Sequence, residues 1–202
     1  MLTHYRKRLK SLRNFKICLL LGLAFGGQYA LADYEAGVNA AFNGDFEAAF
    51  HEFSVAAEEG LDLAQYNLGI LYFIGQGVDQ DFALAFKWTE AAALQGHIAA
   101  QFNLGNLYYE GQGVKRDRDK TVEWFEKAAK GGHADAAMAL AMMYVEGDHV
   151  RKNPVLAHAW ASVAATNENL DAAELRSDLE KKMSSEQLSQ ARRQFAIWQI
   201  ER

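Results

Sequence analysis

The sequence predicts an all-α fold: a solenoid of stacked, antiparallel helix pairs, with capping helices at its C-terminal end. The first observation is a repeat, since Leu68, Leu104 and Leu140 are spaced 36 residues apart. The second is that whole phrases recur, because AQYNLGILYFIGQGV at 64–78 returns as AQFNLGNLYYEGQGV at 100–114 and more loosely around 137–150. A fixed period of this length is typical of stacked supersecondary units, which usually present a binding surface and not a catalytic pocket.

The first helix of each unit follows from apolar residues at helical spacing. Gly69 interrupts this helix at a cost of ~1 kcal/mol relative to alanine, so we expect a partner helix to approach where a Cβ would clash. Gly105 and Ala141 keep the same position small. Gly75 is expected to end the helix in a left-handed conformation. The buried face of the first such helix consists of Ala64, Leu68, Leu71 and Tyr72.

The second helix of each unit is predicted to begin after Asp81, Asp117 and Asn153, three residues of the types that favour the N-cap. Pro154 then occupies the first helical position, where its missing N–H costs nothing. Gly96 and Gly132 are expected to end this helix. Its inward stripe consists of Ala85, Trp88 and Ala92, then Trp124 and Ala128, then Ala157, Trp160 and Ala164, with the tryptophans as structural anchors.

The ends of the array differ from its middle. Residues 33–62 keep part of the pattern and predict a helix pair with a shorter loop. Three full repeats follow at about 64–99, 100–135 and 136–167, within the range 63–167. Position 168 is Glu168 where Gly132 predicts another glycine, so we expect the pattern to stop there. Residues 168–202 are predicted to form two capping helices, the second starting at a capping box of Ser184 and Gln187.

Residues 1–32 have the features of a secretory signal peptide. Six basic residues and no acidic residue precede an apolar stretch at 17–26, and Ala30 and Ala32 stand at the two positions that a signal peptidase reads. We expect cleavage after Ala32, a periplasmic or secreted location, and no membrane insertion after cleavage. The alternative is an inner-membrane anchor through residues 17–31, although the apolar stretch is short of the ~20 residues that a spanning helix needs.

The charge balance and the single cysteine narrow the possible partners. Without residues 1–32 the chain has 15 basic and 26 acidic residues, a formal charge of −11. Nucleic acid and anionic lipid are bound through basic patches, so neither is an expected partner. Cys18 lies at the start of the apolar stretch, so the mature chain is expected to have no thiol, disulfide or lipidation site and to rely on its core.

These residues resemble the Sel-one-like repeat proteins, relatives of the tetratricopeptide repeats with a longer loop in each unit. The motif runs from Leu68-Gly69 through Gly75-Gln76-Gly77-Val78 to Gly96, and a second copy runs from Leu104 to Gly132. The third copy is degenerate, since His149 replaces the second loop glycine. The resemblance implies a right-handed superhelix and a non-enzymatic adaptor for protein–protein contacts. Exported bacterial members act in envelope regulation, assembly and host contact.

In the related tetratricopeptide fold the first helices line a concave groove, which implies a binding site for a partner peptide or helix here. Eight of the nine groove positions are apolar or aromatic, and such a patch usually marks a recognition site. The alternative is that these side chains pack between adjacent first helices and only complete the core. The nine positions are Tyr66, Ile70, Phe73, Phe102, Asn106, Tyr109, Met138, Met142 and Val145.

No catalytic residue, metal ligand or cofactor is expected. The chain has no zinc-protease motif, no phosphate-binding loop and no nucleophile elbow. His97 and His133 recur at the period and are interpreted as polar residues at helix entrances, with a metal role as the alternative. The run from Lys115 to Lys120 alternates in sign and is interpreted as a solvated loop, with a charged docking spot as the alternative.

Two other functions stay open at this point. One is a structural part of an envelope secretion, export or motor complex. The other is a β-lactamase-like hydrolase, because some cysteine-rich members of the family have been linked to β-lactam hydrolysis. The chain beyond residue 32 lacks those cysteines and any serine motif for acylation. Turnover of nitrocefin by the purified protein would favour the hydrolase.

Overall fold

The computed structural model describes residues 29–200, and every regular element within that range is a helix. This confirms the all-α prediction. The chain divides into two compact units, Met1–Gln80 and Asp81–Arg202. After a helical segment at 29–42 the elements are α2 (Phe46–Glu58), α3 (Asp62–Ile74), α4 (Phe82–Leu94), α5 (Ile98–Glu110), α6 (Arg118–Lys130), α7 (Ala134–Glu146), α8 (Pro154–Thr166), α9 (Leu170–Glu180) and α10 (Ser185–Ile200).

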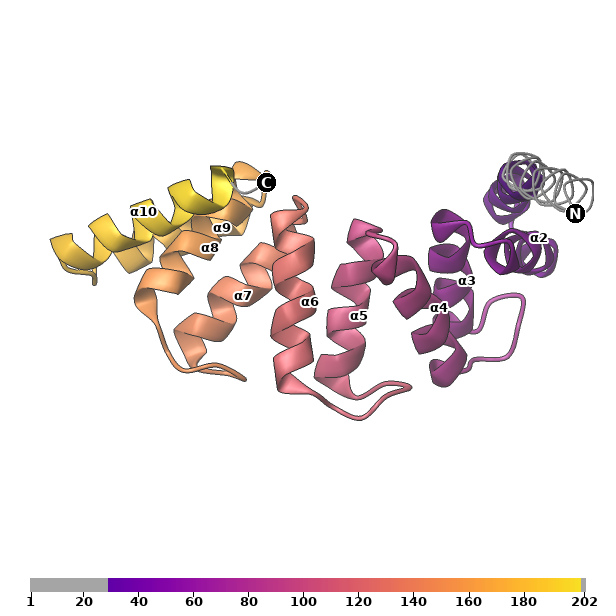
Figure 1. The fold of residues 1–202 in the computed structure, drawn as a ribbon, viewed down its shortest axis with the longest axis horizontal. Coiled ribbons are helices and arrows are strands. Elements are labelled where there is room, and N and C mark those ends of the chain that lie inside the picture. The colour runs from indigo at the N-terminus through magenta and orange to yellow at the C-terminus, as the bar shows by residue number, and fades with distance from the viewer. Residues whose placement is uncertain (1–28, 201–202) are drawn as a thin grey trace, which may run out of the picture. The chain divides into compact units, whose positions relative to one another are not determined.

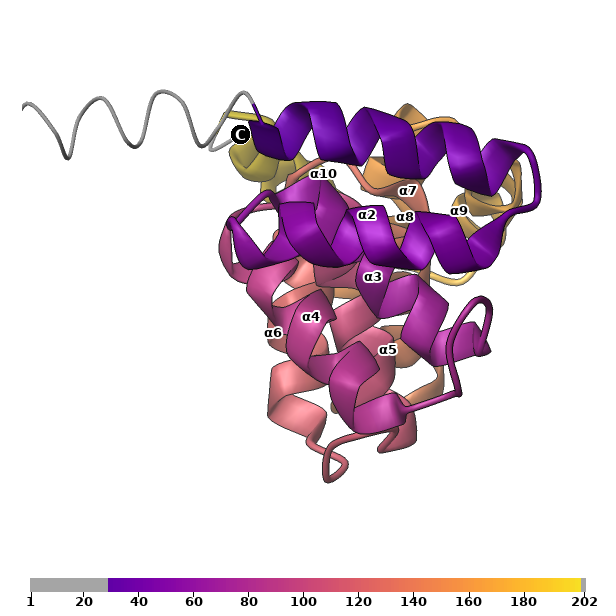
Figure 2. The same cartoon turned by 90° about the vertical axis from the view of Figure 1, so that its right-hand side faces the viewer.

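The first unit consists of the helical segment 29–42, α2 and α3. Segment 29–42 and α2 lie antiparallel, and the short connection between them ends at Asp45, whose carboxylate caps α2 by accepting the Ala48 N–H at 3.0 Å (Figure 2). Segment 29–42 and α2 thus form a helix pair joined by a short connection. α2 packs on α3, where Phe50 meets Tyr72 edge-to-face with ring centroids 5.4 Å apart.

The second unit contains α4 to α10, and consecutive helices pack against one another from α4 to α9 (Figure 1). The contact between α4 and α5 repeats the aromatic pair of the first unit, since Phe86 meets Tyr108 edge-to-face at 5.4 Å. Such pairs stabilise by about 0.5–1.5 kcal/mol beyond the area they bury. The residues 36 positions further on, Val122 and Tyr144, are both half-buried against the core of α6 to α8.

The N-caps of α4, α6 and α8 are the predicted ones. Asp81 accepts the Ala83 and Leu84 N–H groups at 2.8 and 2.9 Å. Asp117 caps α6, and Asn153 caps α8 with Pro154 in its first turn. These side chains satisfy backbone donors that the helix itself leaves unpaired, which is worth about 1 kcal/mol for each cap.

The starts of α5, α7 and α9 are also capped at the repeat period. His97 and His133 accept the Ala100 and Ala136 N–H groups through Nδ1, so both are helix caps. Asn169 does the same for α9, directly after Glu168, which adopts a left-handed φ of 69°. The repeat geometry thus continues past position 168, contrary to the prediction. Glutamate can occupy this conformation at a steric cost of about 1–2 kcal/mol.

Gly105, the glycine inside the first helix of the second repeat, has the predicted role of allowing a neighbouring helix to approach closely. A Cβ on Gly105 would lie 2.5 Å from the Phe125 ring, which packs directly against the α5 backbone. In the first unit Gly37 receives the Phe53 ring in the same way, at 2.6 Å. Leu104 and Leu140 are fully buried, and burial of each such side chain contributes about 1.5–3 kcal/mol.

The C-terminal helices cover the end of the second unit, because both α9 and α10 pack on α8. The Trp160 and Trp198 rings stack with centroids 3.9 Å apart, which confirms Trp160 as a structural anchor. The capping box is present, since Gln187 donates its N–H to the Ser184 hydroxyl and accepts the Ser184 N–H.

The charged run from Lys115 to Lys120 is only partly a loop, because α6 begins at Arg118 and includes residues 118–120 in its first turn. The acidic residue in that turn, Asp119, is favourable near the positive end of the helix dipole. The predicted signal peptide lies largely outside the described residues. Within residues 29–200, no helix is both long and apolar enough to cross a membrane.

The second loop glycine generates the first testable prediction. Gly113 has a φ of 70°, and a Cβ there would overlap the Phe82 carbonyl at the start of α4. Gly113→Ala should therefore lose more stability than the ~1–2 kcal/mol of the left-handed conformation alone. Gly132→Ala is the matched control, because Gly132 has a φ of 103° and open space around its Cβ position. Equal losses in urea unfolding midpoint for the two variants would contradict the backbone contact.

Candidate partner-binding surface

None of the nine predicted groove residues is fully buried. In the first unit, Tyr66 and Ile70 are half-buried and Phe73 is exposed on α3. In the second unit all six are half-buried: Phe102, Asn106 and Tyr109 on α5, and Met138, Met142 and Val145 on α7. Partial exposure leaves room for both interpretations made from the sequence, so the contacts of each side chain decide which applies.

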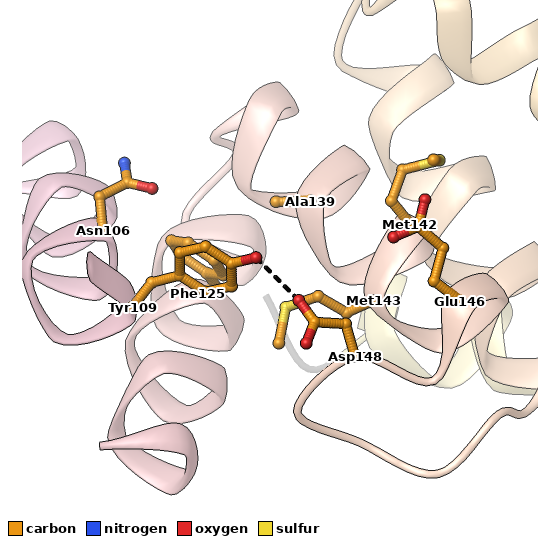
Figure 3. A pocket seen from close by; sticks show the side chains of 8 residues that line it. All are labelled: Asn106, Tyr109, Phe125, Ala139, Met142, Met143, Glu146 and Asp148. Carbon is orange, nitrogen blue, oxygen red and sulfur yellow. Dashed lines mark hydrogen bonds between the residues drawn. The ribbon is translucent and has the colours of Figure 1, made fainter. Parts of the chain in front are cut away.

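An open pocket of about 190 Å³ lies between α5 and α7 in the second unit (Figure 3). Three of the predicted residues line it together, namely Asn106, Tyr109 and Met142. Phe125 of α6 also contributes to the lining. The remaining lining residues are Ala139, Met143, Glu146 and Asp148.

Phe102 and Met138 are engaged in packing. The Phe102 ring stacks on His133 with centroids 4.3 Å apart and lies 5.5 Å from the Phe125 ring. Met138 packs against the buried core of α6 to α8. For these two residues the alternative interpretation applies, since they complete the core between neighbouring helices. Burial lowers the pKa of His133, which favours the neutral ring whose Nδ1 caps α7.

Tyr109 joins α5 to the loop that follows α7. Its hydroxyl donates to Asp148 Oδ2 at 2.8 Å (Figure 3). Its ring stacks on His149 with centroids 4.7 Å apart. His149 Nδ1 lies 2.7 Å from the other Asp148 oxygen. The bond from Tyr109, followed by that from His149, holds the pKa of Asp148 below its ordinary value. The bond to Asp148 and burial raise the pKa of Tyr109.

The loop after α7 departs from the two earlier loops for a steric reason. Gly77 and Gly113 each lie against the backbone at the start of an earlier helix, α2 and α4 respectively, where no Cβ fits. His149 occupies the equivalent position with a φ of 60° and carries a side chain. It therefore cannot make the same approach, and its ring packs on Tyr109 instead.

Glu146 and Asp148 line the pocket but are not among the residues predicted from the sequence. Asp148 stands where the repeat changes, since it replaces the loop glutamines Gln76 and Gln112. Glu146 keeps the residue type of Glu110, so the repeat gave no sign of it. For Asp148 the departure from the repeat was the available signal.

The first unit has a shallow pocket of its own, of about 390 Å³, lined by uncharged side chains. Of the predicted groove residues it includes Ile70, which lies there with Asn67 and Ile74 of α3. Tyr34 and Val38 of segment 29–42 form the opposite wall. This surface offers apolar contact without a charged group.

The geometry supplies no site for metal chemistry within residues 29–200. In that range no group of three or more histidine, cysteine, aspartate or glutamate side chains is placed to hold a metal ion. The Asp148–His149 pair is engaged with Tyr109. What the second unit offers is a recess with an apolar floor and two carboxylates at its edge, an arrangement suited to binding.

The family follows from the repeat itself. The model of the Sel1 repeat matches residues 62–97, 98–133 and 134–169, just over half of the chain. The chain belongs to the Sel1-repeat family. The matched stretches begin two residues before the predicted repeats, and the third reaches position 169, where Asn169 caps α9. Proteins of this family are generally non-enzymatic scaffolds for protein–protein interaction.

Two solved structures are similar to this Sel1-repeat chain. A protective antigen of uropathogenic Escherichia coli strains, described as displaying an SLR fold, is 37% identical, with a TM-score of 0.68 over 75% of this chain and 32% of that one. A Sel1 repeat protein from Oxalobacter formigenes is 32% identical, with a TM-score of 0.64 over 69% of this chain and 56% of that one. These matches confirm the solenoid fold class. No curated protein matches the chain.

The Tyr109–Asp148 bond generates a pH prediction. Because the folded pKa of Asp148 is depressed, its contribution to stability is present above the ordinary aspartate pKa and is lost as pH falls through the folded value. Tyr109→Phe should cost about 1 kcal/mol or less at neutral pH, since Asp148 is partly exposed, and the difference from the unmodified protein should shrink in acid.

Asp148→Asn provides the control for this measurement. In that background the side chain has no charge to lose, so between neutral and acid pH Tyr109→Phe should have the same cost throughout in urea unfolding. A pH-independent cost in the parent protein would show that the carboxylate does not depend on Tyr109.

Proposed function

We propose that this Sel1-repeat protein is a non-enzymatic adaptor of the bacterial cell envelope, and that it binds a peptide or helix of another protein on the α5–α7 face. The α5–α7 face is defined by Asn106, Tyr109, Met142 and Val145 with the pocket between the two helices. The supporting observation is that Asn106, Tyr109 and Met142, three residues of the groove that the family resemblance implies, line one open pocket.

The chemistry of this face favours a protein partner. Aromatic and methionine side chains are enriched in protein interfaces, and methionine adapts its shape to different partners. The four residues that define the α5–α7 face are only half-buried, so part of their apolar surface stays available to a second molecule. The excess of acidic residues beyond position 32 works against nucleic acid and anionic membranes, whose phosphates carry the same sign.

The envelope location rests on residues 1–32, with their basic start, apolar stretch and Ala30-Leu31-Ala32 sequence. If this segment is a cleaved signal, protein recovered from the periplasm or the medium should begin at Asp33, and intact mass spectrometry measures this directly. An anchored protein would keep the full segment and sediment with the inner membrane. Ala32→Asp should block processing if the cleavage site is correct, since a signal peptidase reads small residues there.

Site-specific crosslinking tests the binding face. A photoreactive phenylalanine analogue in place of Met142 should yield one crosslinked protein in intact cells, identified by mass spectrometry. The same analogue at Lys130, an exposed position of α6 outside the face, is the matched control. Because the analogue reacts only with nearby groups, the adduct should form at position 142 and not at 130.

Two outcomes would contradict the proposed face. One is an adduct of equal yield at both positions. The other is the absence of any adduct at position 142 while the protein is folded and present at its normal level. Tyr109 and Phe102 are unsuitable for this test because both hold neighbouring elements together.

A further inference from the structure

We propose that the pocket between α5 and α7 receives an arginine side chain from the bound partner segment. This inference rests on the proposed function and specifies the chemistry of the partner at that face. It is drawn from the combination of an apolar floor, an unpaired carboxylate at the rim and a volume suited to one long side chain.

The floor of the pocket suits the aliphatic part of arginine. The floor consists of apolar side chains, namely Ala139, Met142, Met143 and the Phe125 ring (Figure 3). The three methylene groups of an arginine stem can lie against such a surface while the charged end stays near water. The open pocket, of about 190 Å³, has room for such a side chain.

The rim of the pocket carries negative charge. Glu146 is an exposed residue in the lining of the pocket. Within the described residues its carboxylate forms no ion pair or hydrogen bond. Asp148 is partly balanced, because His149 contacts it and Arg118 acts on it at longer range. The acidic groups therefore exceed the basic ones, and a cation would complete the site.

The position of Glu146 is unfavourable for the helix that carries it. It is the last residue of α7, where the helix dipole disfavours a negative charge by about 0.3–1 kcal/mol. At the corresponding place in the preceding repeat, Glu110 pairs with Arg116 at 3.7 Å. Lys152 stands where that arginine would be, and within the described residues it forms no ion pair with Glu146. An external cation would supply the missing partner.

Arginine fits better than lysine. The guanidinium is planar, more weakly hydrated and able to bind a carboxylate through two parallel hydrogen bonds. It also stacks on aromatic rings, and the Tyr109 ring lines the pocket. Asp148 keeps acceptor capacity beside its two internal bonds, because an ionised carboxylate has about four lone-pair directions.

The methionine methyl groups provide a direct readout of binding. The chain has five methionines, and three of them, Met138, Met142 and Met143, lie on α7, while Met183 lies beyond α9. The probe is an acetylated and amidated pentapeptide with arginine at its centre and leucine on each side, titrated against protein labelled at the methionine methyl carbon. We expect shifts at Met142 and Met143 and none at Met183.

Two matched peptides test the charge. Citrulline has nearly the shape of arginine without its charge, and lysine has the charge without the planar group. We expect binding about fivefold to tenfold weaker for citrulline and detectably weaker for lysine. Equal affinity of the citrulline peptide would overturn the proposal, and so would equal affinity of the lysine peptide.

A protein variant tests the carboxylate. Glu146→Gln should weaken the arginine peptide about fivefold to tenfold and leave the citrulline peptide unchanged, with thermal stability equal or higher because the helix end loses an unfavourable charge. Glu174→Gln, an exposed position of α9, is the control and should change neither. Unchanged arginine binding in Glu146→Gln would overturn the proposal.

The results separate this inference from the proposed function. If Met142 crosslinks to a protein in cells while charge makes no difference to peptide binding, the adaptor face stands and the arginine assignment fails. If Met142 fails to crosslink, the proposed function fails irrespective of the peptide results.

Discussion

The fold depends on how closely a phenylalanine ring of one helix can approach the backbone of the helix before it. In the second unit Phe125 packs over Gly105, and in the first unit Phe53 packs over Gly37. The two residues of each pair are separated by different lengths of sequence because the loop of the first unit is shorter, yet the contact is the same. A close approach of this kind brings two helices together with small residues at the seam, which is consistent with the predominance of alanine among the buried residues.

A second constraint links the second helix of one repeat to the first helix of the next, within each compact unit. The edge-to-face pairs Phe50–Tyr72 and Phe86–Tyr108 have nearly the same geometry, one in each compact unit. Each pair joins the second helix of one repeat to the first helix of the next. Local caps set where helices begin, and these aromatic contacts set how neighbouring repeats pack. Stability in such arrays is roughly a sum of terms within repeats and between adjacent repeats.

Much of this could be predicted from the sequence because its signals are local and periodic. The caps at Asp117 and Asn153 follow from residue type, and the buried leucines follow from helical spacing. The capping function of His97 and His133 was harder to predict, because imidazole is an uncommon cap. The turn at Glu168 was missed because glutamate, unlike glycine, gives no sign of a left-handed conformation.

The candidate site could be predicted only in part. The resemblance to the tetratricopeptide fold implied Asn106, Tyr109 and Met142 as groove residues, and they lie on consecutive first helices. It could not separate them from Phe102, since the stacking of that ring on His133 depends on three-dimensional packing. Asp148 belongs to a loop, and its position next to Tyr109 joins residues 39 apart in sequence.

His149 has a consequence for how the array can change. The two earlier loops contact the backbone at the start of an earlier helix through a glycine, so glycine is required at that position. The third loop does not make this contact, because His149 occupies the position of the glycine and carries a side chain. This loop is held instead by the contacts of Asp148 and His149 with Tyr109. Its sequence is therefore constrained through one side chain of α5, and a substitution of Asp148 changes the rim of the adjacent pocket directly.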